Sequence, residues 1–223
     1  MGPTPDAQSI LDFMRALRDN NSRDWFEANR PRYEAARADF LSIVGDLLGR
    51  FDAVDDLGSI ALKDCVFRIN RDLRFSKDKT PYKTAMTALL GSRGRKSGAR
   101  SYYFHLEPDG RSMLAGGLYD PSSAQLYKVR SAIALDAKPL KRIIARPEFV
   151  RYFGSLSGES LKTAPQGFEK DHPAIELLRL KQFVAIHGMS DKEVVASDLV
   201  SNALEAFAAM KSFLVYLEKT LAD

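Results

Sequence analysis

Residues 101–119 read SYYFHLEPDGRSMLAGGLY. Two strand candidates in this stretch, Ser101–Glu107 and Ser112–Tyr119, flank the triplet Pro108-Asp109-Gly110. Proline presets φ, aspartate caps the turn locally and glycine accepts a positive φ, so the triplet favours a tight turn. The stretch therefore predicts a β-hairpin in the middle of the chain.

The segments around this hairpin complete the expected fold. The chain up to Phe51 has apolar residues at helical spacing, and a strand candidate follows at Asp64–Phe75. After the hairpin come further helices, a strand candidate at Gln182–His187 and an amphipathic helix over Asp191–Leu221 that can break near Ser197. We expect an α+β fold, with an antiparallel sheet of about four or more strands packed by N- and C-terminal helices.

The composition of the 223 residues is that of an ordinary globular protein, with 45% hydrophobic and 28% charged residues. No linker divides the chain, so we expect a single domain over residues 1–223. The one cysteine, Cys65, excludes an internal disulfide and a cysteine-rich metal site, and it favours a reducing compartment. Met1–Asp12 lacks a signal-peptide pattern and the apolar runs are short, so we expect a cytoplasmic protein that does not enter a membrane.

Positive charge is concentrated in one part of the chain. The net charge is +4, but the stretch Arg68–Arg100 alone holds ten basic and two acidic residues, a net +8 that leaves −4 elsewhere. This distribution says more about anionic partners than the net charge does. The basic residues of the stretch are Arg68, Arg71, Arg74, Lys77, Lys79, Lys83, Arg93, Arg95, Lys96 and Arg100.

The most distinctive part of this stretch is the basic segment, residues 67–83, which reads FRINRDLRFSKDKTPYK. If its first part is a strand, side chains alternate between two faces. The core face then holds Cys65, Phe67, Ile69, Leu73 and Phe75, with Arg71 among them. The other face is a polar row of Arg68, Asn70, Asp72 and Arg74 after Val66. Arg71 therefore differs from the other arginines, and we expect it to need a buried partner.

The end of the basic segment has the pattern of a helix start. In Thr80-Pro81, threonine suits the N-cap and proline the first helical position, so we expect a helix from Tyr82 to Leu90. A helix N-terminus offers free N–H groups and a partial positive charge. Lys77, Lys79 and Lys83 would flank it after a short charged loop, which predicts an anion site.

The first functional hypothesis is therefore a pocket for an anionic, phosphate-bearing ligand, either a nucleotide or a nucleic acid. The candidate ligand-binding residues are Arg68, Asn70, Arg71, Asp72, Arg74, Lys77, Asp78, Lys79, Thr80, Tyr82 and Lys83. Three alternatives stay open: an enzyme that acts on a small phosphorylated or carboxylated substrate, a non-catalytic protein-interaction module, and a surface ion-pair network without a ligand.

Candidate acid/base groups for an enzyme are few. They are Asp72, Asp78, His105 and Glu107. His105 and Glu107 share one face of their strand with Tyr103, which suits an acid/base pair or two metal ligands. Three scattered histidines are normal for this length, so we expect no metal site and no cofactor. The oligomeric state is left open.

Two further patterns have ordinary interpretations beside functional ones. Residues 93–98 form a flexible basic loop that can contact nucleic acid phosphates or simply be solvated, and Tyr102 and Tyr103 follow it closely. Trp25, Phe26 and Tyr33 are expected in the core rather than in a stacking platform.

Several motifs together resemble the widespread bacterial and fungal family called domain of unknown function 2461. The resemblance covers nearly the whole chain, and the basic segment is its most specific part. It implies no activity, since no function of the family carries over. The matching stretches are residues 21–26 with Asn29 and Tyr33, the basic segment 67–83, residues 116–119, and residues 171–173 with 180–181.

Overall fold

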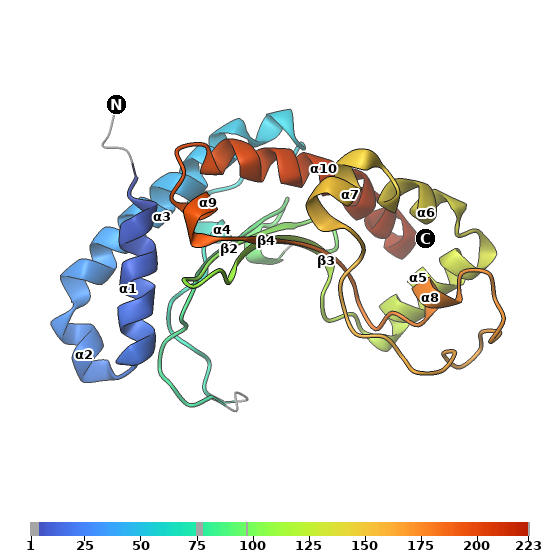
Figure 1. Cartoon of the computed structure of the whole chain (residues 1–223), viewed down its shortest axis with the longest axis horizontal. Coiled ribbons are helices and arrows are strands. Elements are labelled where there is room, and N and C mark those ends of the chain that lie inside the picture. The colour runs from blue at the N-terminus through green and yellow to red at the C-terminus, as the bar shows by residue number, and fades with distance from the viewer. Residues whose placement is uncertain (1–4, 75–77, 97, 223) are drawn as a thin grey trace. The chain divides into compact units, whose positions relative to one another are not determined.

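The computed structural model describes residues 5–74, 78–96 and 98–222 (Figure 1). Contacts divide the chain into two compact units. The first unit comprises Met1–Ser97, Tyr103–Leu114 and Gly188–Glu205, and the second comprises Gly98–Tyr102, Ala115–His187 and Ala206–Asp223. Each unit is assembled from three separate stretches of chain. The single domain expected over residues 1–223 stays a prediction.

The first unit begins with helices that their own polar side chains cap. The Asp6 carboxylate accepts hydrogen bonds from two backbone N–H groups of α1, and the Ser22 hydroxyl accepts one from the Trp25 N–H in α2. α1 and α3 pack side by side (Figure 1). The helical elements of this unit are α1 (Ala7–Asp19), α2 (Arg23–Ala28), α3 (Arg30–Arg50), η1 (Phe51–Ala53), α4 (Leu62–Cys65), η2 (Gly94–Lys96), α9 (Asp191–Val194) and the start of α10 (Leu199–Ala222).

The described strands form one antiparallel sheet with the order β1-β2-β3-β4. Its strands are β1 (Met86–Leu90), β2 (Tyr102–Leu106), β3 (Ser112–Leu118) and β4 (Phe183–Met189). The predicted hairpin is confirmed as β2–β3, and Asp109 and Gly110 both adopt positive φ in its turn, at 66° and 69°. The expected α+β class, with helices before and after a central sheet, is therefore confirmed.

The sheet residues with even numbers form the core face of the first unit. Ala88 and Leu90 of β1 and Phe104 and Leu106 of β2 are fully buried. Phe40 of α3 packs on Phe104 with the ring centroids 6.0 Å apart. Because strand side chains alternate, the odd-numbered residues of β1 and β2 lie on the opposite face.

The second unit has its own helices around the body of α10. Phe149 of α7 meets Phe213 of α10 edge to face at 6.0 Å. Gly116 of β3 allows a close approach, since a Cβ there would lie 2.7 Å from the Met210 sulfur. The remaining helices of the unit are α5 (Ser123–Leu135), α6 (Lys138–Ile144), α7 (Pro147–Phe153) and α8 (Ile175–Leu178). None of the helices within the described ranges has the length and apolar character to cross a bilayer.

The structure corrects two expectations for the basic segment. Asp64–Phe75 is not a strand: α4 ends at Cys65, and the chain then makes single antiparallel bridges, Val66 with Ala88 and Asn70 with Tyr82. Phe75 lies outside the described residues. Between the two bridges the backbone does not form a regular ladder. One hydrogen bond still connects the two segments there, from Phe67 N to Thr87 O at 3.0 Å.

The predicted helix from Tyr82 to Leu90 is also wrong, because this stretch is a bridge followed by β1. The physical reason is that long-range pairing uses the backbone groups that a helix would need. Lys83 N donates to Ile69 O, and Pro81 O accepts from Arg71 N, both at 2.9 Å. Thr80 does not cap a helix, since its N–H and hydroxyl both donate to the Asp78 carboxylate. No helix N-terminus exists there to bind an anion.

The hairpin turn is fixed by an ion-pair network around Asp191 of α9. The Asp191 carboxylate accepts the Asp109 and Gly110 N–H groups at 3.0 and 2.9 Å, and it pairs with Arg15 at 3.0 Å. Asp109 in turn pairs with Arg15 and Arg18 at 3.1 and 2.6 Å. The network holds a turn in which a non-glycine residue adopts positive φ.

We expect Asp191→Ala to lower the free energy of unfolding by about 1–2 kcal/mol, because two turn N–H groups lose a charged acceptor. Urea unfolding measures the change. Asp46→Ala is the control, since Asp46 only forms an exposed i,i+4 pair with Arg50 at 3.6 Å, and it should change the value by less than about 0.5 kcal/mol. Equal effects of the two variants would contradict the role of the network.

Candidate functional site

Three extended segments of the first unit bring side chains to one pocket, and all of these except Thr84 have odd numbers. The segments are residues 66–71, 81–88 and 103–107. Backbone hydrogen bonds connect neighbouring segments, and the Thr84 hydroxyl donates a further hydrogen bond to the Glu107 carboxylate at 3.0 Å. The pocket measures about 270 Å³, and we name it the Lys83 pocket. Its lining residues are Phe67, Arg71, Lys83, Thr84, Ala85, Thr87, Tyr103, His105 and Glu107.

Tyr103 and His105 of β2 and Glu107, the residue after β2, form a series of hydrogen bonds along the pocket, which we name the Tyr–His–Glu chain. The Tyr103 hydroxyl lies 3.1 Å from His105 Nδ1, and His105 Nε2 lies 3.0 Å from a Glu107 oxygen. An ionised carboxylate only accepts, so Nε2 carries the proton, and Nδ1 of the neutral ring accepts from the tyrosine hydroxyl. The chain is the arrangement that orients an imidazole for proton transfer.

The environment of His105 favours its neutral form. The side chains of His105 and Glu107 are only 12% and 17% exposed. Burial lowers the pKa of His105 below its usual value, and the hydrogen bond to Glu107 opposes this only in part. The predicted pairing of His105 with Glu107 on one strand face is therefore present as a direct contact.

Glu107 has partners for both of its oxygens. One oxygen accepts from the Thr84 hydroxyl and pairs with Arg111 at 3.2 Å, while the other faces His105. Its backbone N–H donates to the Ser112 hydroxyl at 3.0 Å, which ties the end of β2 to the start of β3. The negative charge of Glu107 is thus already neutralised within the protein.

Lys83 is the cation of the pocket that has no such neutralisation. The side chain is half-buried, and Nζ lies 5.3 Å from the centroid of the Phe67 ring. No carboxylate in the described part of the chain forms an ion pair with it. Burial lowers the pKa of Lys83, and the charges of Arg68, Arg71 and Arg95 lower it further.

Arg71 forms the other basic wall of the pocket and also closes the loop beside it. The guanidinium donates to Thr80 O and Tyr82 O at 3.2 and 3.1 Å and pairs with Asp78 at 2.9 Å. Its side chain is 23% exposed. Arg71 differs from the other arginines, as expected, but the expected buried partner on the core side is wrong: Arg71 lines the pocket, and its carboxylate partner Asp78 is 50% exposed.

The two other acid/base candidates do not line the pocket. Asp72 binds Arg74 through two hydrogen bonds, at 3.0 and 2.7 Å, on the exposed side of the loop. These contacts hold the pKa of Asp72 well below its usual range. Hydrogen bonds from Thr80 likewise lower the pKa of Asp78. Both carboxylates are stabilised as anions, which suits structural contacts better than proton transfer.

The remaining predicted ligand-binding residues are scattered around the loop. Arg68 and Asn70 are exposed, and the Lys79 ammonium donates to Leu73 O at 3.0 Å. Thr80 is occupied by Asp78. Lys77 lies outside the described residues. Of the predicted set, Arg71 and Lys83 are the residues that the pocket brings together with His105 and Glu107.

Tyr82 is buried and connects the basic segment to the N-terminal motif. Asn21 donates to Tyr82 O at 3.0 Å and accepts from Tyr82 N at 3.1 Å, so its side chain pairs with that peptide as a neighbouring strand would. The rings of Phe26 and Tyr82 stack at 4.0 Å, and Phe26 also packs on Tyr33. Phe26 is 3% exposed, which agrees with the core position expected for it.

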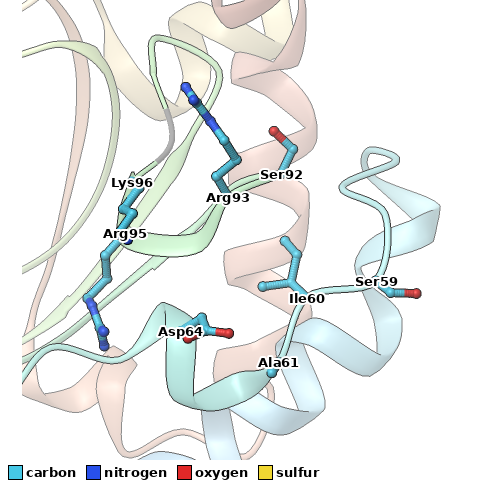
Figure 2. A pocket seen from close by; sticks show the side chains of 8 residues that line it. All are labelled: Ser59, Ile60, Ala61, Asp64, Ser92, Arg93, Arg95 and Lys96. Carbon is cyan, nitrogen blue, oxygen red and sulfur yellow. The ribbon is translucent and has the colours of Figure 1, made fainter.

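The basic loop lines a second pocket of about 330 Å³ (Figure 2). Figure 2 shows the Arg95 side chain extending toward α4 and the Arg93 side chain extending the other way. Arg95 donates to the carbonyl oxygens of Lys63, at 2.9 Å, and of Val66. The start of the loop is therefore the 3₁₀ helix η2 packed on α4. The lining residues are Ser59, Ile60, Ala61, Asp64, Ser92, Arg93, Arg95 and Lys96.

Sequence reasoning missed the lining role of Phe67, Thr84, Thr87 and Tyr103. The alternation of side chains along a strand predicted that Tyr103 shares a face with His105 and Glu107. Which residues of the other two segments face these three depends on the register between the segments. No group of three or more His, Cys, Asp and Glu side chains placed to hold a metal ion occurs in residues 5–74, 78–96 and 98–222.

Comparison with known proteins gives one match. The family model described as conserved hypothetical protein (DUF2461) matches residues 9–216. The chain belongs to this family. The matched region contains every residue that lines the Lys83 pocket. No curated protein and no solved structure matches the chain. The family description names no activity, so the function has to be argued from the site itself.

We expect the stability of the protein to depend on pH through His105. Because the folded-state pKa lies below the usual 6.5, the unfolded chain binds the proton first as pH falls. The stabilisation is complete above 6.5 and is lost as pH falls through the folded-state pKa. Urea unfolding at several pH values measures this, and His105→Gln should flatten the profile.

An NMR titration of His105 tests the same geometry directly. Glu107→Gln removes the carboxylate that favours the charged ring, so the pKa of His105 should fall further in this variant. Asp109→Asn, which changes a carboxylate outside the pocket, is the control and should leave the titration unchanged. A rise of the pKa in Glu107→Gln would contradict the contact.

Proposed function

We propose that this protein binds an anionic, phosphate-bearing ligand in the Lys83 pocket. The observation that carries the proposal is the charge of Lys83, a half-buried ammonium in the pocket that forms no ion pair with a carboxylate of the described residues and whose pKa is lowered by burial and by three arginines. Burying a cation without a counter-ion is unfavourable, and an anion in the pocket would remove that cost. A phosphate group suits this place because it accepts several charge-assisted hydrogen bonds at once.

A neutral donor in the pocket supports a phosphate ligand as well. The Thr87 hydroxyl lines the pocket together with the charges of Lys83 and Arg71, whereas the Thr84 and Tyr103 hydroxyls already donate to Glu107 and His105. Hydroxyl and cationic donors together are the usual means of holding phosphate oxygens. The volume of about 270 Å³ suits one phosphoryl group and part of a small ligand, so we favour a nucleotide-sized molecule over a nucleic acid.

We also propose a cytoplasmic location, supported by the state of the one cysteine. Cys65 is a free, fully buried thiol, and burial raises its pKa to about 11. A protonated, inaccessible thiol is packing material rather than a reactive group, and a reducing compartment keeps it in that state.

We expect Lys83→Met to weaken ligand binding by at least about tenfold, because the central cation is lost. Isothermal titration against a panel of nucleotides and inorganic phosphate measures the affinity. The side chain of methionine fills similar space over Phe67, so the fold should persist, and a thermal melt checks this. Lys79→Met is the matched control, since Lys79 belongs to the basic segment but does not line the pocket.

The comparison of the two lysines separates a pocket from a charged surface. Equal losses in Lys83→Met and Lys79→Met would show that the segment attracts anions through its net charge and would contradict the pocket. Salt dependence separates the two ligand classes, since affinity for a nucleic acid falls steeply with salt in proportion to the phosphates contacted. A flat salt dependence would exclude the nucleic acid.

A second candidate is an enzyme that acts on a small phosphorylated or carboxylated substrate. The specific observation in its favour is the Tyr–His–Glu chain, which lies in the same pocket as Lys83 and Arg71. In this candidate His105 and Tyr103 move a proton, Glu107 orients the ring, and the cations hold the anionic group of the substrate.

If the second candidate holds, Glu107→Gln should reduce turnover by about 100-fold or more while ligand affinity stays within about twofold. The reason is that a glutamine side chain has the shape of glutamate but carries no charge, so it does not stabilise a protonated His105 imidazole. Turnover of a panel of phosphorylated and carboxylated compounds, measured beside binding, gives both values. A variant with unchanged turnover would exclude proton transfer through this chain.

A further inference from the structure

We infer that Lys83 Nζ is a nucleophilic amine that forms an imine with the carbonyl carbon of a phosphorylated aldehyde or ketone. The inference rests on the proposed function, since the same pocket has to hold the anionic end of the ligand. It adds the chemical class of the ligand, which is a phosphorylated carbonyl compound, and it gives Lys83 a covalent role that simple anion binding does not need.

The surroundings of Lys83 are those that make an amine nucleophilic. The Lys83 side chain is half-buried in the pocket, and the positive charges of Arg68, Arg71 and Arg95 act on its ammonium group. A lysine that is partly desolvated and close to other cations loses its proton more readily, and only the neutral amine attacks a carbonyl. The lowered pKa of Lys83 agrees with this geometry.

The acids near the pocket do not counteract this effect, because each has a partner of its own. Asp78 pairs with Arg71 and accepts from Thr80. Glu107 pairs with Arg111 and faces His105. A carboxylate bound to Lys83 would hold the ammonium form, and no such pair exists among the residues that the structure describes.

The distribution of roles among the cations is consistent with a ligand that has two functional groups. Arginine stays charged under all ordinary conditions and holds a phosphate, whereas lysine can give up its proton. Arg71 is anchored by three contacts and lines the pocket as a fixed cation. Lys83 lines the same pocket with Nζ over an aromatic ring rather than in an ion pair.

The covalent step balances without any other reagent. The lone pair of Nζ attacks the carbonyl carbon, and the carbonyl oxygen takes up a proton to give a carbinolamine. The C–O bond then breaks, the oxygen leaves as water with both amine protons, and the C=N bond forms. The Tyr103 hydroxyl takes up a proton from nitrogen while its own proton passes to His105 Nδ1, and Glu107 stabilises the imidazolium that results. The same path then returns the proton to the departing oxygen.

The experiment uses pyridoxal 5′-phosphate as the probe, because it contains an aldehyde and a phosphate. The full chain is incubated with a limiting amount of probe, the imine is reduced with borohydride, and the modified peptides are identified by mass spectrometry. Lys83 should be modified about tenfold more than Lys79 or Lys96 at neutral pH, as expected for an amine that is more often deprotonated. Inorganic phosphate should suppress this modification.

Three variants separate the role of the amine from the role of the charge. Lys83→Arg keeps a cation but removes the nucleophile, so it should form no adduct in the pocket and should bind phosphate more tightly than Lys83→Met does. Lys79→Arg is the matched control and should leave the modification of Lys83 unchanged. Tyr103→Phe should slow imine formation, because it removes a proton donor while Lys83 and Arg71 stay in place.

Glycolaldehyde phosphate serves as a second, smaller probe, so that the size of pyridoxal does not decide the result. Modification of Lys83 that is no faster than that of Lys79 with both probes would overturn the inference. If phosphate still binds in that case, the proposed function stands and only the imine chemistry fails. If phosphate does not bind either, the proposed function fails with it.

Discussion

The alternation of side chains on three paired extended segments is the constraint on which the first unit depends. One face must be apolar because α3 covers it, as the contact between Phe40 and Phe104 shows. Residues of opposite parity then point to the other face, whatever their chemistry. Lys83, Tyr103 and His105 meet there because each has the parity of a non-core position. The pocket is therefore a consequence of core formation together with strand register.

Among the described charged residues that line the pocket, charge pairing leaves Lys83 without a carboxylate partner. Arg71 satisfies two loop carbonyl groups and pairs with Asp78, while Glu107 pairs with Arg111 and His105. Each of these contacts stabilises the fold, so the residues are committed before any ligand binds. Lys83 gains no such contact, and its burial makes its charge costly. A group that destabilises the free protein slightly and faces a pocket is a good candidate for function.

Local signals in the sequence predicted the hairpin, most helices and the separation of Arg71, because turn residues and periodicity act over a few positions. The Thr80-Pro81 helix was wrong because hydrogen bonds to residues 69 and 71, distant in sequence, outweighed a local capping pattern. The pocket itself was beyond such reasoning. His105 and Glu107 were recognised as a pair, but their meeting with Lys83 depends on the register between segments, which no short motif specifies.

The N-terminal motif also bears on the pocket, although it supplies none of the lining residues. Asn21 binds both backbone polar groups of residue Tyr82, and Phe26 stacks on the Tyr82 ring. The next residue is Lys83, whose backbone N–H donates to Ile69 O. The peptide group between Tyr82 and Lys83 is thus held on both sides, at its carbonyl oxygen by the N-terminal motif and at its N–H by the basic segment. This double restraint explains why two motifs far apart in the chain serve one site: together they hold Lys83 in place.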